Sequence, residues 1–210
     1  MPDTTAWLAF ALLALGLVLT PGPNMIYLVS RSLSQGRRAG LVSLGGVALG
    51  CMFYVLCASF GLTALLLSVP YAYDALRLGG AAYLLYLAWQ ATRSNGHSPF
   101  EVRALPHSSP RQLFGMGLLT ALLNPKIAMF YLSLLPQFID PARGSVLAQS
   151  LALGFTQVVV SVSVNALIAT AAGSISRFLA RRPLWLAVQR WLMGTVLAGL
   201  AVRLALDTRR

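Results

Sequence analysis

Six apolar runs divide the chain, and polar or basic segments separate them. The runs lie at residues 5–29, 39–68, 70–92, 113–138, 145–175 and 184–206. A helix needs about 20 apolar residues to cross a bilayer, and each run is long enough. The start of the chain lacks the basic region of a signal peptide, so we expect the first run to be retained. The pattern predicts an all-α membrane protein with six transmembrane helices.

One proline-containing pattern occurs twice, at a constant offset of 104 residues. Leu19, Pro21, Met25, Tyr27 and Leu28 recur as Leu123, Pro125, Met129, Tyr131 and Leu132. A proline inside a helix removes a backbone hydrogen bond and costs about 3 kcal/mol. We therefore expect the first and fourth transmembrane helices to be broken at these prolines.

The repeated pattern also predicts how the chain is organised. Residues 1–92 form a first repeat of three spans, 93–112 a cytoplasmic linker, and 113–210 a second repeat of three spans. Because three is odd, the second repeat must enter the bilayer in the opposite direction. Inverted-topology repeats with broken helices are typical of secondary transporters, which bind substrate near the midplane.

The basic residues lie in blocks between the spans. The net charge is +11, and the blocks follow the first, third and fifth runs: Arg31, Arg37, Arg38; Arg93, Arg103, Arg111; Arg177, Arg181, Arg182. Positively charged loops stay in the cytoplasm, so these loops mark the cytoplasmic side. The lipid bilayer explains this charge better than nucleic acid does, and we expect no nucleic-acid partner.

The two breaks offer groups that suit a zwitterion. Prolines 21 and 23 should leave the carbonyls of Leu17 and Leu19 unpaired, and Pro125 that of Ala121. Free carbonyls can accept hydrogen bonds from an ammonium group, while the N–H groups of a restarting helix favour a carboxylate. The alternative is a pair of packing kinks that neighbouring side chains repair.

Lys126 is the only lysine and follows the second break directly. Its ammonium and the positive helix end at Asn24 together suit one carboxylate. Two other roles stay open: a lysine that reaches an interface, or one that binds the carbonyls of the broken helix. On the fifth run, a polar stripe lines one helix face as a permeation path or as interhelical contacts: Ser150, Gly154, Gln157, Ser161 and Asn165.

Enzymatic and redox chemistry find little support in the sequence. Cys51 and Cys57 lie on one helix about 9 Å apart by helical rise, too far for a disulfide. We expect two buried, inert thiols, although a transmembrane thiol-redox protein remains the alternative. The spans contain no nucleophile–base arrangement or cluster of metal ligands. We therefore expect a protein that is not an enzyme and has no metal or cofactor.

Three motifs resemble the LysE/RhtB family of amino-acid exporters: Thr20-Pro21-Gly22-Pro23-Asn24, the run Gly-Gly-Ala-Ala-Tyr-Leu at 79–84, and Asn124-Pro125-Lys126 followed by Pro136-Gln137-Phe138. The resemblance implies a multi-pass exporter in the bacterial inner membrane, driven by proton antiport. Members of that family often carry an acidic residue where this chain has Met52 and Ser161. We therefore expect neutral substrates of the homoserine, threonine or leucine kind; a homo-oligomer is left open.

The candidate substrate-binding residues lie at the two breaks, on the helices that follow them and on the polar stripe: Thr20, Pro21, Gly22, Pro23, Asn24, Tyr27, Asn124, Pro125, Lys126, Tyr131, Gln157, Ser161 and Asn165.

Overall fold

The computed structural model describes residues 3–20, 22–68 and 105–180, with short helical pieces between 78 and 89 and between 191 and 206. Within these residues the fold is helical and contains no strand. The predicted spans 70–92 and 184–206 lie mostly outside the described residues. The described helices therefore come mainly from the other four apolar runs.

Two of these runs form broken helices. The first is α1 (Thr4–Leu19) followed by α2 (Pro23–Gln35), with a bend of 54° between them. The second is α5 (Pro110–Leu122) followed by α6 (Pro125–Met129), where the bend is 49°. Beyond α6 the chain forms a π-helical turn, η1 (Phe130–Leu134), and a 3₁₀ turn, η2 (Leu135–Phe138).

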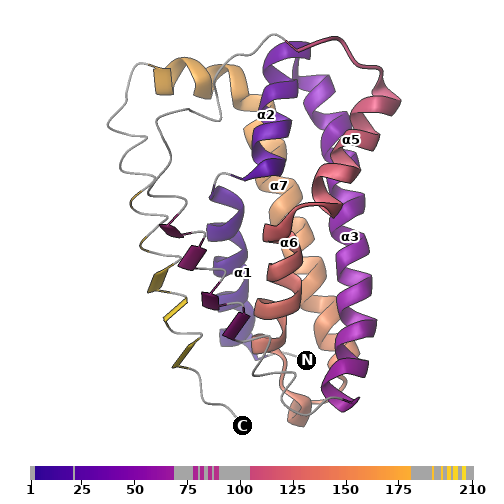
Figure 1. Ribbon diagram of the computed structural model, residues 1–210, viewed down its shortest axis with the longest axis vertical. Helices are drawn as coiled ribbons and strands as arrows, with labels where there is room; N and C mark the ends of the chain where they lie inside the picture. The colour runs from indigo at the N-terminus through magenta and orange to yellow at the C-terminus, as the bar shows by residue number, and fades with distance from the viewer. Residues whose placement is uncertain are drawn as a thin grey trace.

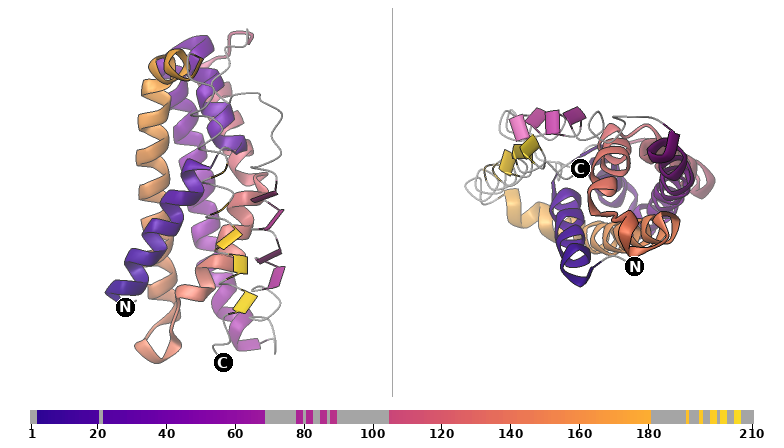
Figure 2. Two further views of the ribbon diagram at one scale, coloured as in Figure 1. Left: turned by 90° about the vertical axis from the view of Figure 1, so that its left-hand side faces the viewer. Right: turned by 90° about the horizontal axis from the view of Figure 1, so that it is seen from below.

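The other two runs form long continuous helices, α3 (Arg37–Ser68) and α7 (Val146–Ala180). Both are long and apolar enough to cross a membrane, and each broken pair also qualifies if counted as one span. The described part thus contains two to four candidate spans. In Figures 1 and 2, α1 and α2 run upward while α5 and α6 run downward, and both breaks lie near mid-height.

Small residues let α3 approach α5 and α7 closely. A Cβ atom at Gly46 would lie 2.0 Å from the carbonyl oxygen of Phe114, and one at Gly117 would lie 2.1 Å from that of Ser43. On the other side of α3, a Cβ at Gly154 would meet a methyl group of Val55 at 2.8 Å. These glycines therefore act in helix packing, the role that small residues commonly have in membrane helices.

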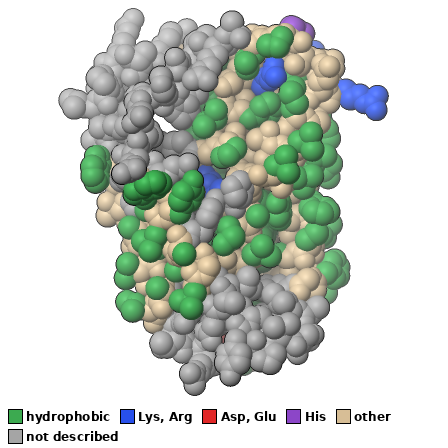
Figure 3. All heavy atoms as spheres, viewed as in Figure 1, with side chains coloured by type: hydrophobic (Ala, Val, Ile, Leu, Met, Phe, Trp, Pro, Cys, Tyr) green, Lys and Arg blue, Asp and Glu red, His purple; other side chains and the backbone are tan. Residues whose placement is uncertain are grey.

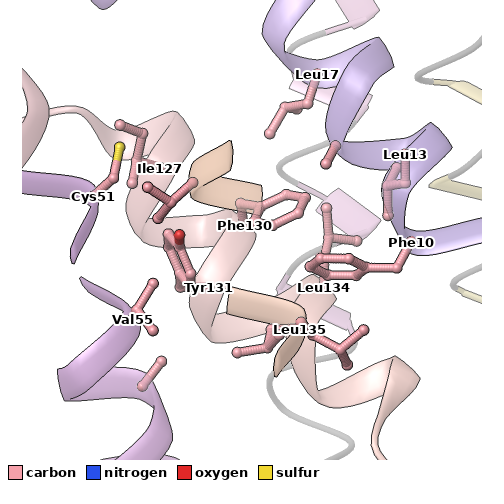
Figure 4. Close-up of a cluster of buried hydrophobic side chains, with 14 of the residues drawn as sticks. Phe10, Leu13, Leu17, Cys51, Val55, Ile127, Phe130, Tyr131, Leu134 and Leu135 are labelled. Carbon is pink, nitrogen blue, oxygen red and sulfur yellow. The ribbon is translucent and has the colours of Figure 1, made fainter. Parts of the chain in front are cut away.

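Aromatic side chains fill the core below the breaks. Figure 4 shows Phe10 of α1 pointing toward Phe130 and Leu134. The ring centroid of Phe10 lies 5.3 Å from that of Phe130 and 5.2 Å from that of Phe138. Tyr131 is fully buried, and its ring stacks on that of Tyr54 at 6.0 Å. This cluster joins α1 and α3 to the segment that follows the second break.

The two ends of the bundle differ in charge. In Figure 3, hydrophobic side chains cover much of the visible described face, and most of its Lys and Arg side chains lie near the upper end. At the lower end, Arg143 of the 3₁₀ turn η3 (Pro141–Arg143) forms ion pairs with Asp3 and Asp140. The basic upper end corresponds to the side that the sequence assigns to the cytoplasm.

Arg31 does not lie in a loop, as its place in a basic block suggested. Helix α2 continues to Gln35, and the Arg31 side chain is only 8% exposed. The apolar run ends near residue 29, but the helix does not, because neighbouring elements supply polar partners for Arg31.

Candidate functional site

The helices before both breaks end in a contracted turn, which the sequence did not predict. The backbone N–H of Thr20 donates to the carbonyls of Gly16 and Leu17 at 3.1 and 3.2 Å, and the N–H of Asn124 donates to that of Ala121 at 3.1 Å. The expectation of unpaired Leu17 and Ala121 carbonyls is therefore wrong. At both breaks the last helical turn contracts so that an N–H three residues on satisfies the carbonyl.

Each helix restarts with a proline at its first position, where a missing N–H costs nothing. For α6 the cap is Asn124, whose side-chain oxygen accepts the backbone N–H of Lys126 at 3.0 Å. For α2 the cap is Gly22, an extended residue with no side chain to cap the helix. The restarting prolines are thus Pro23 and Pro125, which are 125 − 23 = 102 residues apart. The sequence pattern instead paired Pro125 with Pro21.

Two hydrogen bonds join the breaks to each other. The side-chain amide of Asn124 donates to the side-chain oxygen of Asn24 at 3.1 Å. The ammonium of Lys126 donates to the backbone carbonyl of Thr20 at 2.6 Å. Thr20, Asn24 and Asn124 are buried, whereas Lys126 is partly exposed. Residues that are about 100 positions apart in the chain therefore form one polar cluster, which we call the break cluster.

Gly22 gives Lys126 its place beside the end of α1. A Cβ atom at Gly22 would lie 3.1 Å from the Lys126 nitrogen and 3.5 Å from its terminal carbon. The lysine side chain thus lies directly against the extended backbone between α1 and α2. This close approach lets its ammonium reach the Thr20 carbonyl at the C-terminal end of α1.

The break cluster has a positive electrostatic character. It holds the N-terminal ends of α2 and α6, each with a partial positive charge from the helix dipole, and the Lys126 ammonium. The carboxylates of the described residues are Asp3 and Asp140, and both pair with Arg143 at the lower end of the bundle. Lys126 therefore has no carboxylate partner among the described residues, and the cluster can bind an anionic group.

The remaining candidates make bonds outside the break cluster. Tyr27 donates to the Leu113 carbonyl at 2.8 Å and accepts a bond from Ser43. Tyr131 donates to the side-chain oxygen of Gln157. The Asn165 amide donates to the Ser161 carbonyl one turn earlier on α7.

Members of the predicted polar stripe on α7 thus make hydrogen bonds: Gln157 with the core residue Tyr131, and Asn165 with Ser161 within α7. Each member of the stripe is buried, as a single helix face turned toward the bundle requires: Ser150, Gly154, Gln157, Ser161 and Asn165. Pro21 lies outside the described residues, and the side chain of Pro125 is not described.

Gln149 and Arg31 are among the buried polar residues that were not predicted from the sequence, and one thiol was misjudged. Gln149 is fully buried and donates to the carbonyls of Asp140 and Gly144, so it holds the loop before α7. Its place directly before Ser150 on the polar stripe was the available signal. Arg31, described above, was assigned to a loop. Cys51 and Cys57 are both free, but Cys57 is exposed rather than buried.

These features define a multi-pass helical membrane protein in which two broken helices meet at a buried polar cluster. The chain belongs to the LysE type translocator family, whose model matches residues 15–208. The resemblance noted from the sequence motifs is thereby confirmed. Membership and the apolar helices together place the protein in the cell membrane as a multi-pass protein.

Several named relatives align over most of the chain. A homoserine/homoserine lactone efflux protein of Salmonella typhimurium is 34% identical over 173 residues, which is 82% of this chain and 83% of the relative. A leucine efflux protein of the same organism is 28% identical over 91% of both chains. A membrane protein of Vibrio cholerae without a described function is 31% identical over 97% of this chain and 98% of the relative. No solved structure matches the chain.

Proposed function

We propose that this protein exports neutral amino acids or close derivatives from the cytoplasm by proton antiport. Two relatives that align over most of the chain carry the names homoserine/homoserine lactone efflux protein and leucine efflux protein. Both names describe the outward movement of neutral amino acids or a derivative. The break cluster supports the same class of substrate, because its groups match the two charges of a zwitterion.

The observation that carries the proposal is the meeting of two helix N-termini and one ammonium group. A substrate carboxylate binds the start of α2 near Asn24, the start of α6, and the Lys126 ammonium. An ammonium carries three N–H donors, and one of them bonds to the Thr20 carbonyl. The others remain for a carboxylate. The substrate ammonium in turn binds Thr20 and the other carbonyls that end α1, where the helix dipole is negative.

The contact between Lys126 and Thr20 also fits the narrower role of satisfying a broken-helix carbonyl. The two roles are compatible if the contact belongs to the empty protein. A substrate ammonium then competes for the same carbonyl, and the lysine turns to the carboxylate.

A neutral side chain fits the charges of the spans better than a basic one. No acidic residue lies well inside an apolar run: Asp74 is near the start of the run 70–92, and the other four acids lie outside the runs. Met52 and Ser161 stand where the sequence resemblance would lead us to look for an acid. A lysine or arginine side chain would place a further positive charge near the Lys126 ammonium without a counter-ion. In a low-dielectric site that repulsion is costly.

The opposite directions of the two broken helices support an inverted repeat of residues 1–92 and 113–210 around the linker 93–112. In such transporters one repeat rocks against the other around a central site. The hydrogen bonds between Asn24 and Asn124 and between Lys126 and Thr20 lie between the two broken helices. Substrate binding and the rocking of one repeat against the other would therefore both change these two hydrogen bonds.

Proton antiport supplies enough energy for this task. One charge moved across 100 mV provides about 2.3 kcal/mol, which sustains roughly a fortyfold gradient of a neutral solute. The chain itself shows no nucleotide-binding loop in its sequence that would supply another source.

Counterflow in proteoliposomes tests the proposal. Vesicles preloaded with unlabelled L-homoserine, L-threonine, L-leucine or L-lysine receive a trace of the same labelled amino acid, and its transient accumulation is measured. We expect accumulation with at least one neutral amino acid, none with lysine, and chemically unchanged substrate. Accumulation of lysine alone, or no accumulation of any of the four by protein that is correctly inserted, contradicts the proposal.

A further inference from the structure

We propose that Arg31 forms a second carboxylate-binding site on α2, between the cytoplasmic end of the bundle and the break cluster. Its ligand is the carboxylate of the transported amino acid, which binds there before it reaches Lys126. The inference rests on the proposed function and adds a binding site that the substrate occupies first on its way from the cytoplasm.

The guanidinium of Arg31 is buried but only partly satisfied. One terminal nitrogen, Nη1, donates to the side-chain oxygen of Gln35 and to the Pro106 carbonyl, both at 3.2 Å. The other, Nη2, has the sulfur of Met116 at 3.6 Å. The third nitrogen, Nε, is buried and has no hydrogen-bond partner. No carboxylate of the described residues forms an ion pair with this side chain.

The unpaired Nε lies on the edge of the guanidinium that suits a carboxylate, together with Nη2, whose partner is the Met116 sulfur. The N–H groups of Nε and Nη2 point the same way, and arginine binds carboxylates with two such parallel bonds. A thioether sulfur is a weak acceptor and does not replace the charged partner that this edge would otherwise hold. Burying a charged guanidinium without an anionic partner costs free energy. An anionic ligand that binds this edge would remove much of that cost.

The position of Arg31 on α2 links the edge to the break cluster. Arg31 follows Asn24 by seven residues, which is about two helical turns or roughly 10 Å along the axis. The two residues therefore share one face of the helix. The Tyr27 ring lies between them in sequence, and the Arg31 guanidinium lies over it at 5.9 Å from the ring centroid.

The Met116 side chain, which contacts Nη2, can move away from the guanidinium. Methionine is unbranched and has three rotatable bonds, so it adopts other positions at low cost. Its partly exposed side chain lies on α5, which belongs to the second broken span. A carboxylate that displaces this side chain gains two charge-assisted hydrogen bonds in exchange for one weak contact.

A purely structural role of Arg31 is the competing explanation. Its bond to Pro106 joins α2 to the segment before α5, and Gln35 makes a parallel bond to the Ser108 carbonyl at 3.2 Å. The variant Gln35→Ala removes the second link and one Arg31 partner but leaves the guanidinium edge in place. It is therefore the matched control for a loosened segment.

The test measures counterflow from the cytoplasmic face of oriented proteoliposomes, with L-homoserine and L-leucine as probes. Arg31→Lys keeps the positive charge but removes the two-pronged edge. Since charge-assisted hydrogen bonds are the strong ones, we expect the half-saturating concentration to rise about tenfold with an unchanged maximal rate. Inhibition by leucinol, which has no carboxylate, should not change. Gln35→Ala should leave the half-saturating concentration unchanged.

A second variant tests the site through stability as well as transport. In Met116→Glu, the new carboxylate can occupy the edge from within the protein. We expect a higher melting temperature than for the neutral Met116→Gln and a higher half-saturating concentration for both probes. A lower melting temperature than Met116→Gln would show that the edge does not accept a carboxylate.

Three outcomes of the transport assay overturn this inference alone: an unchanged half-saturating concentration in Arg31→Lys, an equal rise in Gln35→Ala, or an equal rise in Glu101→Gln. The last would assign the edge to an internal ion pair with Glu101, which lies outside the described residues. If instead the unaltered protein shows no counterflow with either probe, the proposed function fails, and this inference fails with it.

Discussion

Asn124 should contribute more to stability than Asn24, although the two side chains share a hydrogen bond. Asn124→Ala removes that shared bond and also the cap that the Asn124 side chain provides to the Lys126 N–H. Asn24→Ala removes only the shared bond. A hydrogen bond between membrane helices contributes about 0.6–2 kcal/mol, and a helix cap contributes about 1 kcal/mol. We therefore expect losses of roughly 1.5–3 kcal/mol for Asn124→Ala and about 1 kcal/mol less for Asn24→Ala.

Thermal unfolding of the purified protein in detergent measures this difference. For a chain of this length 1 kcal/mol corresponds to about 2–4 °C in melting temperature, so Asn124→Ala should melt that much below Asn24→Ala. Asn124→Ser provides the control, because serine also caps helices but is too short to replace the amide donor. It should melt close to Asn24→Ala. Equal melting temperatures for both alanine variants would refute the assignment of Asn124 as the cap of α6.

Two other expectations follow from the packing and from the driving force. Gly117→Ala should destabilise the protein by about 1–3 kcal/mol because the new methyl group meets the Ser43 backbone. Gly115→Ala on the same helix meets nothing within 4 Å and should be neutral or stabilising by up to about 1 kcal/mol; equal melting temperatures would contradict the close approach of α3 and α5. Efflux from cells should collapse when a protonophore is added, and undiminished uphill efflux would exclude proton antiport.

The breaks were predictable from sequence because proline acts locally. It removes a bond and clashes with the preceding turn wherever it stands, so both helices were expected to break near these prolines. The repeat pattern did not show that Pro23, rather than Pro21, begins α2. The donors that the carbonyls at the breaks bind were not predictable. Leu17 and Ala121 found donors three residues on, while the Thr20 carbonyl bonds to Lys126, which is 106 residues away in the chain.

Arg31 shows a second limit of sequence reasoning. An arginine after an apolar run is normally a loop residue, and the charge pattern gave no reason to expect otherwise. The helix continues because Gln35 on the same helix and Pro106 and Met116 from distant segments surround the guanidinium. Contacts of this kind depend on how α2 packs against α5, which no local pattern in the chain records.

The Lys126 ammonium is the one full positive charge of the break cluster, so replacing it tests whether the cluster binds the substrate carboxylate. Lys126→Met keeps a side chain of similar length and removes the charge. Asn24 and Asn124 can offer a substrate carboxylate only neutral hydrogen bonds, each worth about 0.5–1.5 kcal/mol. Their alanine variants should therefore lose less transport than Lys126→Met. The measurement is counterflow of the neutral amino acid carried by the unaltered protein, at concentrations below saturation, with membrane insertion checked in parallel. We expect normal insertion and lost counterflow for Lys126→Met. Counterflow equal to that of the unaltered protein would show that the Lys126 ammonium does not bind the substrate.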